Sequence, residues 1–186
     1  MYKICQKEQS LQRQRTLENG LLELMRKHRY EDISVSDLCE YMQIPRKSFY
    51  RYFSSKDGAL YALLDHTISD FYETPQQSRA TRGSAVGDLD LFFLFWYERK
   101  NFLDALQRNG LSGLLVERAN AFALREGHLP RQFRRWNPES QGLALSFAIC
   151  GLMSMTLQWH RQGYHISAQE MTKLAIEMLT QPLLHK

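Results

Sequence analysis

Two short helical patterns meet at a tight corner within the stretch from Ser34 to Asp57, and this corner limits the fold more than any other part of the chain. Ser34 and Asp37 have the spacing of a capping box, and Ile33 can pack on Leu38 as a hydrophobic staple. Apolar residues then recur at helical spacing, at Val35, Leu38, Cys39 and Met42. This pattern predicts a helix of about two turns, which taken alone is equally well read as an ordinary core helix.

A second helix is predicted to begin at Pro45, because proline suits the first turn of a helix and cannot continue the preceding one. Every charged residue in the range 42–56 is positive. Phe49 and Phe53, four residues apart, would anchor one face of this helix in a core. The residues left on or near its other faces are basic, polar or aromatic: Arg46, Lys47, Ser48, Tyr50, Arg51 and Tyr52.

Such a mixture of side chains is what a DNA duplex requires of a helix in its major groove. Arg and Lys can reach guanine edges, while hydroxyl and ammonium groups can hold phosphates. Together the two helices predict a helix-turn-helix motif that binds double-stranded DNA. A solvated basic face remains the alternative for the second helix.

The run from Leu17 to Leu64 resembles the amino-terminal DNA-binding domain of the TetR family of bacterial transcription regulators. The most specific part of the resemblance is the Tyr-x-x-Phe-x-x-Lys pattern that ends at Lys56. Further matching positions are Tyr30, Ser34, Val35, Leu38, Ile44, Ser48, Phe49, Tyr52 and Asp57. Beyond residue 65 the resemblance concerns architecture only, since effector domains in this family are helical but divergent in sequence.

The resemblance implies roles for individual residues. The residues expected to contact bases or phosphates are Arg46, Lys47, Ser48 and Tyr50, and those expected to bind backbone phosphates are Tyr52 and Lys56. Ser34, Ser36 and Arg51 complete the candidate DNA-binding set. The family also has glycine at the positions of Arg29 and Gln43, so a left-handed backbone is expected at both.

The resemblance further implies an all-α protein, with a three-helix DNA-binding domain (residues 1–56) and a helical domain for effector binding and dimerisation (residues 57–186). Ser54 and Asp57 have capping-box spacing and would open a long helix that links the domains as a lever. The first helix is predicted to end near His28. The polar residues 1–14 are either a disordered arm that touches DNA or the frayed start of that helix.

Composition agrees with a globular protein of one or two domains: 186 residues, 44% hydrophobic and 24% charged, with a formal charge of +4. The three cysteines are far apart in the sequence, which favours free thiols in a reducing, cytoplasmic compartment. The first residues lack the apolar segment of a secretory signal. No cofactor, metal site or enzymatic motif is predicted, since no phosphate loop, nucleophile elbow or HExxH sequence occurs.

Aromatic residues are concentrated between Leu91 and Phe102, and there are more of them than one helical face can hold. They form either a filled core or a cavity between helices that binds a small apolar or amphipathic effector. The candidate effector-binding residues are Phe92, Phe95, Trp96 and Phe122. The loop predicted over residues 74–87 precedes this cluster. A second basic cluster contains Arg131, Arg134 and Arg135. It is read as a solvated loop or short helix, with a nucleic-acid patch as the alternative.

Two apolar helices are predicted near the C-terminus. The first begins at Asn137-Pro138 and carries no charged residue from Ser140 to His160, which is long enough to span a bilayer. Its polar residues favour instead a helix buried on two sides, so no membrane location is predicted. The second begins with a capping box at Ser167 and ends before Pro182. Paired across a two-fold axis, they would form a homodimer. The candidate interface residues are Phe147, Leu152, Met155, Trp159, Met171, Leu174 and Met178.

Two functions follow from these expectations. One is a dimeric transcription regulator, a repressor on a palindromic operator that a small effector releases or repositions. The alternative is a DNA-bound scaffold whose C-terminal domain binds a protein. An internal aromatic cavity would favour the first, and a solid core with an exposed apolar patch would favour the second.

Overall fold

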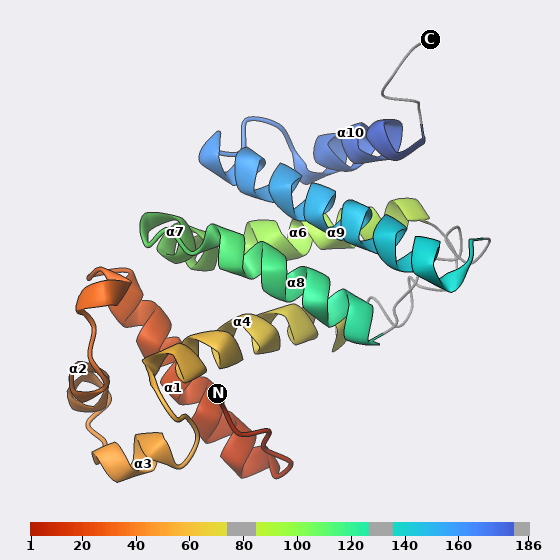
Figure 1. Cartoon of the computed structure of the whole chain (residues 1–186). Coiled ribbons are helices and arrows are strands. Elements are labelled where there is room, and N and C mark those ends of the chain that lie inside the picture. Colours follow the sequence, from red (N-terminus) through yellow and green to blue (C-terminus); the bar gives the residue numbers. More distant parts are fainter. Residues whose placement is uncertain (74–84, 127–135, 181–186) are drawn as a thin grey trace. The chain divides into compact units, whose positions relative to one another are not determined.

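The computed structural model describes residues 1–73, 85–126 and 136–180, which form helices and no strand (Figure 1). The all-α prediction is confirmed. The elements are α1 (Glu8–Met25), η1 (Tyr30–Asp32), α2 (Val35–Tyr41), α3 (Arg46–Tyr50), α4 (Lys56–Glu73), α6 (Ala85–Glu98), α7 (Lys100–Arg108), α8 (Ser112–Glu126), α9 (Pro138–Arg161) and α10 (Ala168–Thr180). Most of the predicted loop before α6, the basic cluster Arg131, Arg134 and Arg135, and Pro182 lie outside the described residues.

The chain forms two compact units, with boundaries inside α4, inside α7 and directly before α8. Unit 1 contains residues 1–67 and 104–111, and unit 2 contains residues 68–103 and 112–186. The last residues of α7 and the turn after it therefore belong with the helix-turn-helix segment. The division of the sequence after residue 56 stays a prediction.

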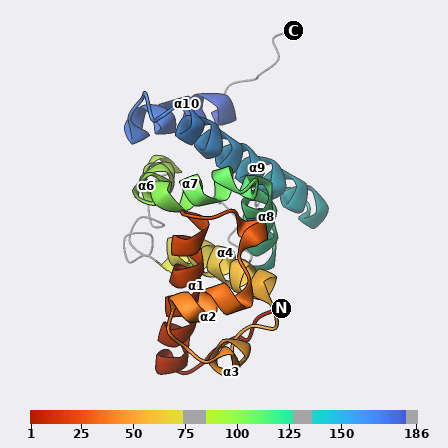
Figure 2. The same ribbon diagram turned by 90° about the vertical axis from the view of Figure 1, so that its left-hand side faces the viewer.

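The core of unit 1 is built by α1, α2, α3 and α4 (Figure 2), each of which contributes buried apolar side chains. Its fully buried side chains include Leu21, Leu38, Phe49 and Leu64. The α2 capping box forms as predicted, with Ser34 N donating to Asp37 Oδ2 (2.7 Å) and Asp37 N donating to Ser34 Oγ (3.1 Å). Gly20 lets α1 approach the end of α2, because a Cβ there would lie 2.3 Å from Met42 Sδ.

The two positions expected to have a left-handed backbone differ. Gln43 has φ = 52°, so the corner between α2 and α3 requires this conformation from a non-glycine residue. Arg29 has φ = −68° and ψ = 138°, an extended conformation, so the expectation is wrong there. Arg29 leads directly into η1, and this turn is made without a left-handed residue.

Residues 1–7, which precede α1, pack against the rest of unit 1. They are therefore neither a disordered arm nor the frayed start of a helix. Lys3 N donates to Tyr52 O (2.9 Å), and Ser54 N donates to Met1 O (3.1 Å). Tyr2 forms an antiparallel bridge with Phe53. We call residues 1–7 the N-terminal arm. The Ser54–Asp57 capping box is not formed, because Ser54 Oγ donates to Met1 O and Ser55 Oγ instead accepts from Gly58 N.

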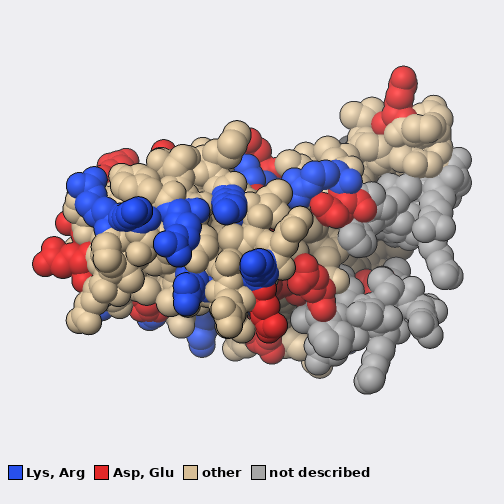
Figure 3. All heavy atoms as spheres, turned by 90° about the horizontal axis from the view of Figure 1, so that it is seen from below, with Lys and Arg blue, Asp and Glu red and all other residues tan. Residues whose placement is uncertain are grey.

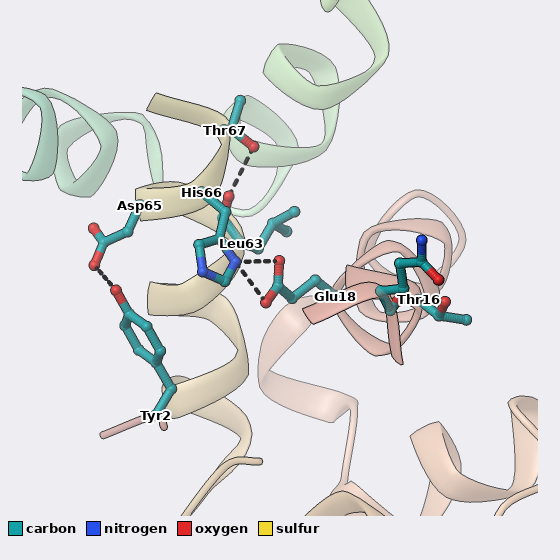
Figure 4. Close-up of polar contacts among 8 residues, drawn as sticks. Tyr2, Thr16, Glu18, Leu63, Asp65, His66 and Thr67 are labelled. Atoms are coloured by element: carbon teal, nitrogen blue, oxygen red, sulfur yellow. Dashed lines mark hydrogen bonds and ion pairs between the residues drawn. The ribbon is translucent and has the colours of Figure 1, made fainter. Parts of the chain in front are cut away.

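Two side-chain pairs connect α4 to the elements beside it (Figure 4). The hydroxyl of Tyr2 donates to Asp65 Oδ2 at 2.6 Å, which ties the N-terminal arm to α4. Nδ1 of His66 lies 2.9 Å from both carboxylate oxygens of Glu18, which ties α1 to α4. Glu18 is almost fully buried, so this pairing satisfies a carboxylate that would otherwise be costly to bury.

In unit 2, α8 packs along α9 and α6 packs on α10. The predicted helix starts are confirmed: Ser140 N donates to Asn137 Oδ1 (2.9 Å), and Ser167 and Glu170 form a capping box. The turn between α9 and α10 is closed by Trp159, whose Nε1 donates to Ile166 O at 2.9 Å.

Candidate nucleic-acid interface

Helix α3 presents a basic surface on an aromatic anchor. It is only five residues long, and Phe49 in its second half is fully buried, with its ring 5.2 Å from that of Phe53. The aromatic anchor is therefore as predicted. The exposed residues are Arg46, Lys47, Tyr50 and Arg51, while Ser48 is half-buried. Within the residues that the structure describes, no ion pair engages these three basic side chains.

Tyr52 does not lie on an outer face, contrary to the expectation from the sequence. Its side chain is 7% exposed and its ring lies 6.3 Å from that of Phe53. The residue directly follows the end of α3. Its backbone N–H donates to Phe49 O (3.0 Å), and its carbonyl oxygen accepts a hydrogen bond from Lys3 N. Tyr52 therefore supports both α3 and the N-terminal arm.

Lys56 is engaged by the protein itself. Its Nζ donates to Tyr30 O at 2.5 Å and to Glu31 O at 3.3 Å, and it lies 4.3 Å from the centre of the Tyr30 ring. Tyr30 Oη donates to Asp57 Oδ1 at 2.5 Å. Burial, together with this hydrogen bond, strongly raises the pKa of the Tyr30 hydroxyl. Lys56 therefore braces η1 against the start of α4.

Asn109 is a contact residue that the sequence did not indicate. Its Oδ1 accepts from Tyr30 N (2.5 Å), and its Nδ2 donates to Met25 O (3.1 Å) and Ala105 O (2.7 Å). One side chain thus satisfies backbone groups at the end of α1, at η1 and in α7, all within unit 1. Only its position before Gly110, which has φ = 68°, marks it as a helix-end residue.

The two serines at the start of α2 differ in their surroundings. Ser34 is exposed, and its hydroxyl oxygen already accepts the capping hydrogen bond from Asp37 N. Ser36 is exposed in the first turn of α2. Hydroxyls at a helix start lie where backbone N–H groups also point outward, an arrangement that suits phosphate oxygens.

Positive charge gathers on the face that contains α3. Figure 3 views this face from below, and it shows Lys and Arg side chains spread across it. The exposed basic residues of α3 and the N-terminal arm are Lys3, Lys7, Arg46, Lys47 and Arg51. An arrangement of this kind attracts a polyanion and releases counterions when the polyanion binds.

The four candidate effector-binding residues are buried in unit 2. Phe92, Phe95, Trp96 and Phe122 are each under 10% exposed. Phe71 of α4 contacts Phe92 and Phe95 edge to face, with ring centres 5.6 and 5.2 Å apart. Tyr72 stacks on Phe122 (5.1 Å), and burial raises the pKa of its hydroxyl to about 12. The Trp96 indole N–H is buried without a hydrogen-bond partner among the described residues.

The candidate dimer residues fall into two groups. Phe147, Leu174 and Met178 are exposed, and Leu152 and Met155 are half-buried. Trp159 and Met171 are instead buried within unit 2, with Trp159 2% exposed against Phe93 and Tyr164. These two side chains belong to the core of their own protomer rather than to a surface that a partner can reach.

Helix α9 is long and apolar enough to cross a membrane by length and composition, with 28% of its most apolar window buried in the structure. One helix of this kind is weak evidence for a membrane location, because core helices share the same properties. Within the described ranges no group of three or more His, Cys, Asp or Glu side chains could hold a metal ion.

No protein-family model matches the sequence, and no match is found among curated proteins. Among solved structures, the chain is similar to the fatty acid degradation regulator FadR from Bacillus halodurans (TM-score 0.58, 15% identity, covering 98% of this chain and 100% of that one). It is similar to the dihydroxyacetone kinase operon activator DhaS (TM-score 0.57, 15% identity, covering 90% of this chain and 93% of that one). It is also similar to a tetR-family transcriptional regulator from Streptomyces coelicolor (TM-score 0.52, 21% identity, covering 88% of this chain and 77% of that one). The chain therefore shares the all-helical fold of these solved proteins.

Proposed function

We propose that this protein is a DNA-binding transcription regulator that uses α3 as its recognition helix. The observation that carries the proposal is the exposed surface of α3, where Arg46, Lys47 and Arg51 have no ion-pair partner among the described residues. A solvated basic face needs no fixed geometry. In this chain, by contrast, a buried phenylalanine and a left-handed corner at Gln43 hold the helix in one orientation.

Arg46 and Lys47 are the proposed base readers, because they stand in the first turn of α3, where residues of a recognition helix reach base edges. Ser34, Ser36, Ser48, Tyr50 and Arg51 are the proposed phosphate and flanking contacts. Tyr52 and Lys56 act mainly by supporting these residues, since their polar or charged ends already face the protein.

The regulator is proposed to act as a homodimer through α9 and α10. Leu143 and Phe147 on α9 are 75% and 67% exposed, and Met178 and Leu179 add an exposed apolar edge on α10. Large apolar side chains in such a row favour a partner surface. A two-fold axis would put two α3 helices on successive major grooves, about 34 to 36 Å apart or at a multiple of that distance.

A small apolar or amphipathic effector is proposed to bind the aromatic cluster of unit 2. The unpaired Trp96 N–H supports this proposal, because a buried donor without a partner is costly and a ligand acceptor would satisfy it. Effector binding would release the operator, so the protein would act as a repressor. A protein of similar fold, DhaS, is named an operon activator, so activation is the alternative. Expression of a reporter from the operator, with and without the gene for this protein, distinguishes repression from activation.

One observation favours a second candidate, the DNA-bound scaffold. Phe71 contacts both Phe92 and Phe95, and Phe92 contacts Phe93, as in a filled core, while Leu143 and Phe147 are exposed. A protein partner on α9 would use the same exposed row. Measuring the mass of the purified protein separates the two, since a scaffold without self-association stays monomeric.

The test begins with selection of binding sites from random duplexes, followed by fluorescence anisotropy with the selected duplex and with random duplex. We expect an imperfect palindrome that binds two chains. Replacing Arg46 or Lys47 by Ala should cost about 1–3 kcal/mol on the selected site, or about 5- to 150-fold in affinity, and relax the preference at one position. The matched control is Arg125→Ala, an exposed arginine of α8.

Equal loss of affinity on selected and random duplex would show that neither residue reads a base. Failure to enrich any sequence, with weak binding that disappears as salt rises, would leave only non-specific attraction and refute the regulator.

A further inference from the structure

We propose that the N-terminal arm and the end of α3 together form a binding site for a phosphate of the DNA backbone. The proposal rests on the proposed function, and it adds a contact outside the helix-turn-helix motif. It begins from a cavity of about 240 Å³ lined by residues 3–7, Ser10, Arg51 and Tyr52. This volume exceeds that of several water molecules, so a phosphate group with part of its hydration fits.

The lining of this arm cavity combines apolar surface, to which Ile4 and Cys5 contribute, with basic groups that can attract an anion. It contains the basic residues Lys3, Lys7 and Arg51 and no acidic residue. Ser10 adds a hydroxyl and Gln6 an amide, both of which can donate hydrogen bonds to phosphate oxygens. An anion bound in this space would be attracted to all three cations.

The cavity is held in shape by long-range contacts. The wall that the N-terminal arm forms is held by the hydrogen bond from Lys3 N to Tyr52 O. One residue earlier, the Tyr2 hydroxyl ties the arm to Asp65 of α4. Gly58 is needed for this docking, because a Cβ there would lie only 2.4 Å from Met1 O. The arm is therefore positioned before DNA arrives, which lowers the entropic cost of the contact.

The cavity also lies next to the recognition helix. Arg51 is the C-cap residue of α3, so it belongs both to the end of that helix and to the cavity wall. A backbone that follows the groove past α3 would meet this wall next. Tyr52 lines the same cavity, which offers a route by which this mostly buried residue takes part in a phosphate contact.

The test compares Lys3→Gln/Lys7→Gln with the wild-type protein by anisotropy over a range of salt concentrations. Losing one phosphate contact should lower the slope of log K against log salt by about 0.9. A fourfold rise in salt would then cost the variant about 3.5-fold less affinity than it costs the wild type. The loss should be equal on selected and random duplex, because the contact reads no base.

Lys100→Gln/Lys173→Gln is the matched control, since it removes two exposed charges from unit 2. It should leave the slope unchanged. A second readout uses Cys5, which lines the cavity: the duplex should slow alkylation of its thiol relative to Cys150 in the same sample. This readout uses the wild-type chain and does not depend on how the lysine variants fold.

An unchanged slope in the lysine variant, with Cys5 alkylated at the same rate in the presence of duplex, overturns the phosphate site and leaves the proposed function intact. Protection of Cys5 by inorganic phosphate but not by duplex also overturns it, since the site would then take a free ion. Absence of DNA binding by the wild-type protein overturns both proposals at once.

Discussion

Replacing Asn109 by Ala removes the one side chain that joins the ends of α1, η1 and α7 within unit 1. Three hydrogen bonds are lost together, to Tyr30 N, Met25 O and Ala105 O. The first two partners lie at helix ends, Tyr30 N at the start of η1 and Met25 O at the end of α1, where backbone groups have no partner within the helix. η1 and the start of α4, which Lys56 joins, would lose their link to α7.

The magnitude follows from the count of bonds. Each contributes about 0.5–1.5 kcal/mol net, so three contribute about 1.5–4.5 kcal/mol. The site is only partly buried, and water can reach the freed groups, so we expect about 2–3 kcal/mol. For a chain of this size that lowers the melting temperature by about 4 to 12 °C.

The decisive assay is hydrogen exchange of the Tyr30 amide, because it reports one of the three bonds directly. Loss of about 1.4 kcal/mol at this amide raises its exchange rate about tenfold. Asn101→Ala makes the same change at an exposed position within α7, the helix that Asn109 follows, and should be neutral or slightly stabilising. The reasoning is wrong if Tyr30 exchanges at the wild-type rate in Asn109→Ala, or if both variants melt alike.

Three further predictions concern other parts of the chain. Lys56→Ala should destabilise the protein by about 1–2 kcal/mol in urea unfolding, because the contacts of Lys56 with Tyr30 are lost. Unchanged stability, with a DNA affinity that depends less steeply on salt, would instead identify Lys56 as a phosphate contact. Phe147→Glu should convert a dimer to a monomer in analytical ultracentrifugation without lowering the helix content, and a dimer that persists would place the interface elsewhere. Hydrogen bonds from the Ser34 hydroxyl and backbone lower the pKa of Asp37, so the stability they give is complete above about pH 4 and lost as pH falls through the lowered value. Ser34→Ala removes the hydroxyl and keeps the backbone N–H, so it should reduce this acid sensitivity in an unfolding series measured over pH.

The sequence was most informative where a signal and its partner lie within a few residues. The capping boxes at Ser34 and Ser167 and the start of α9 at Asn137 depend on hydrogen bonds across three residues, and all three form. The box at Ser54 has the same spacing and does not form, because its hydroxyl is taken by Met1. A distant segment can thus overrule a local signal that is correct by itself.

What the sequence did not predict depends on contacts between distant residues. The N-terminal arm reads as polar and unstructured, yet Tyr2 pairs with Asp65 and Lys3 with Tyr52. Asn109 likewise serves residues more than seventy positions away. Hydrogen bonds of this kind leave no periodic pattern, since each needs only one polar residue at a point that the fold defines.

The inward contacts of Tyr52 and Lys56 change what the rest of the interface must do. As the proposed recognition helix, α3 with its five residues would offer only about one and a half turns to a major groove and would reach few phosphates. If the two residues expected to clamp the backbone are used as braces, further phosphate contacts must come from beside the helix. Lys3 and Lys7 are exposed at its C-terminal end and are fixed there by the docked arm. Tyr52 therefore connects two parts of the proposed interface. Its ring packs on Phe53 beneath α3, and its carbonyl oxygen accepts from Lys3 N and so holds the N-terminal arm, whose lysines would add phosphate contacts.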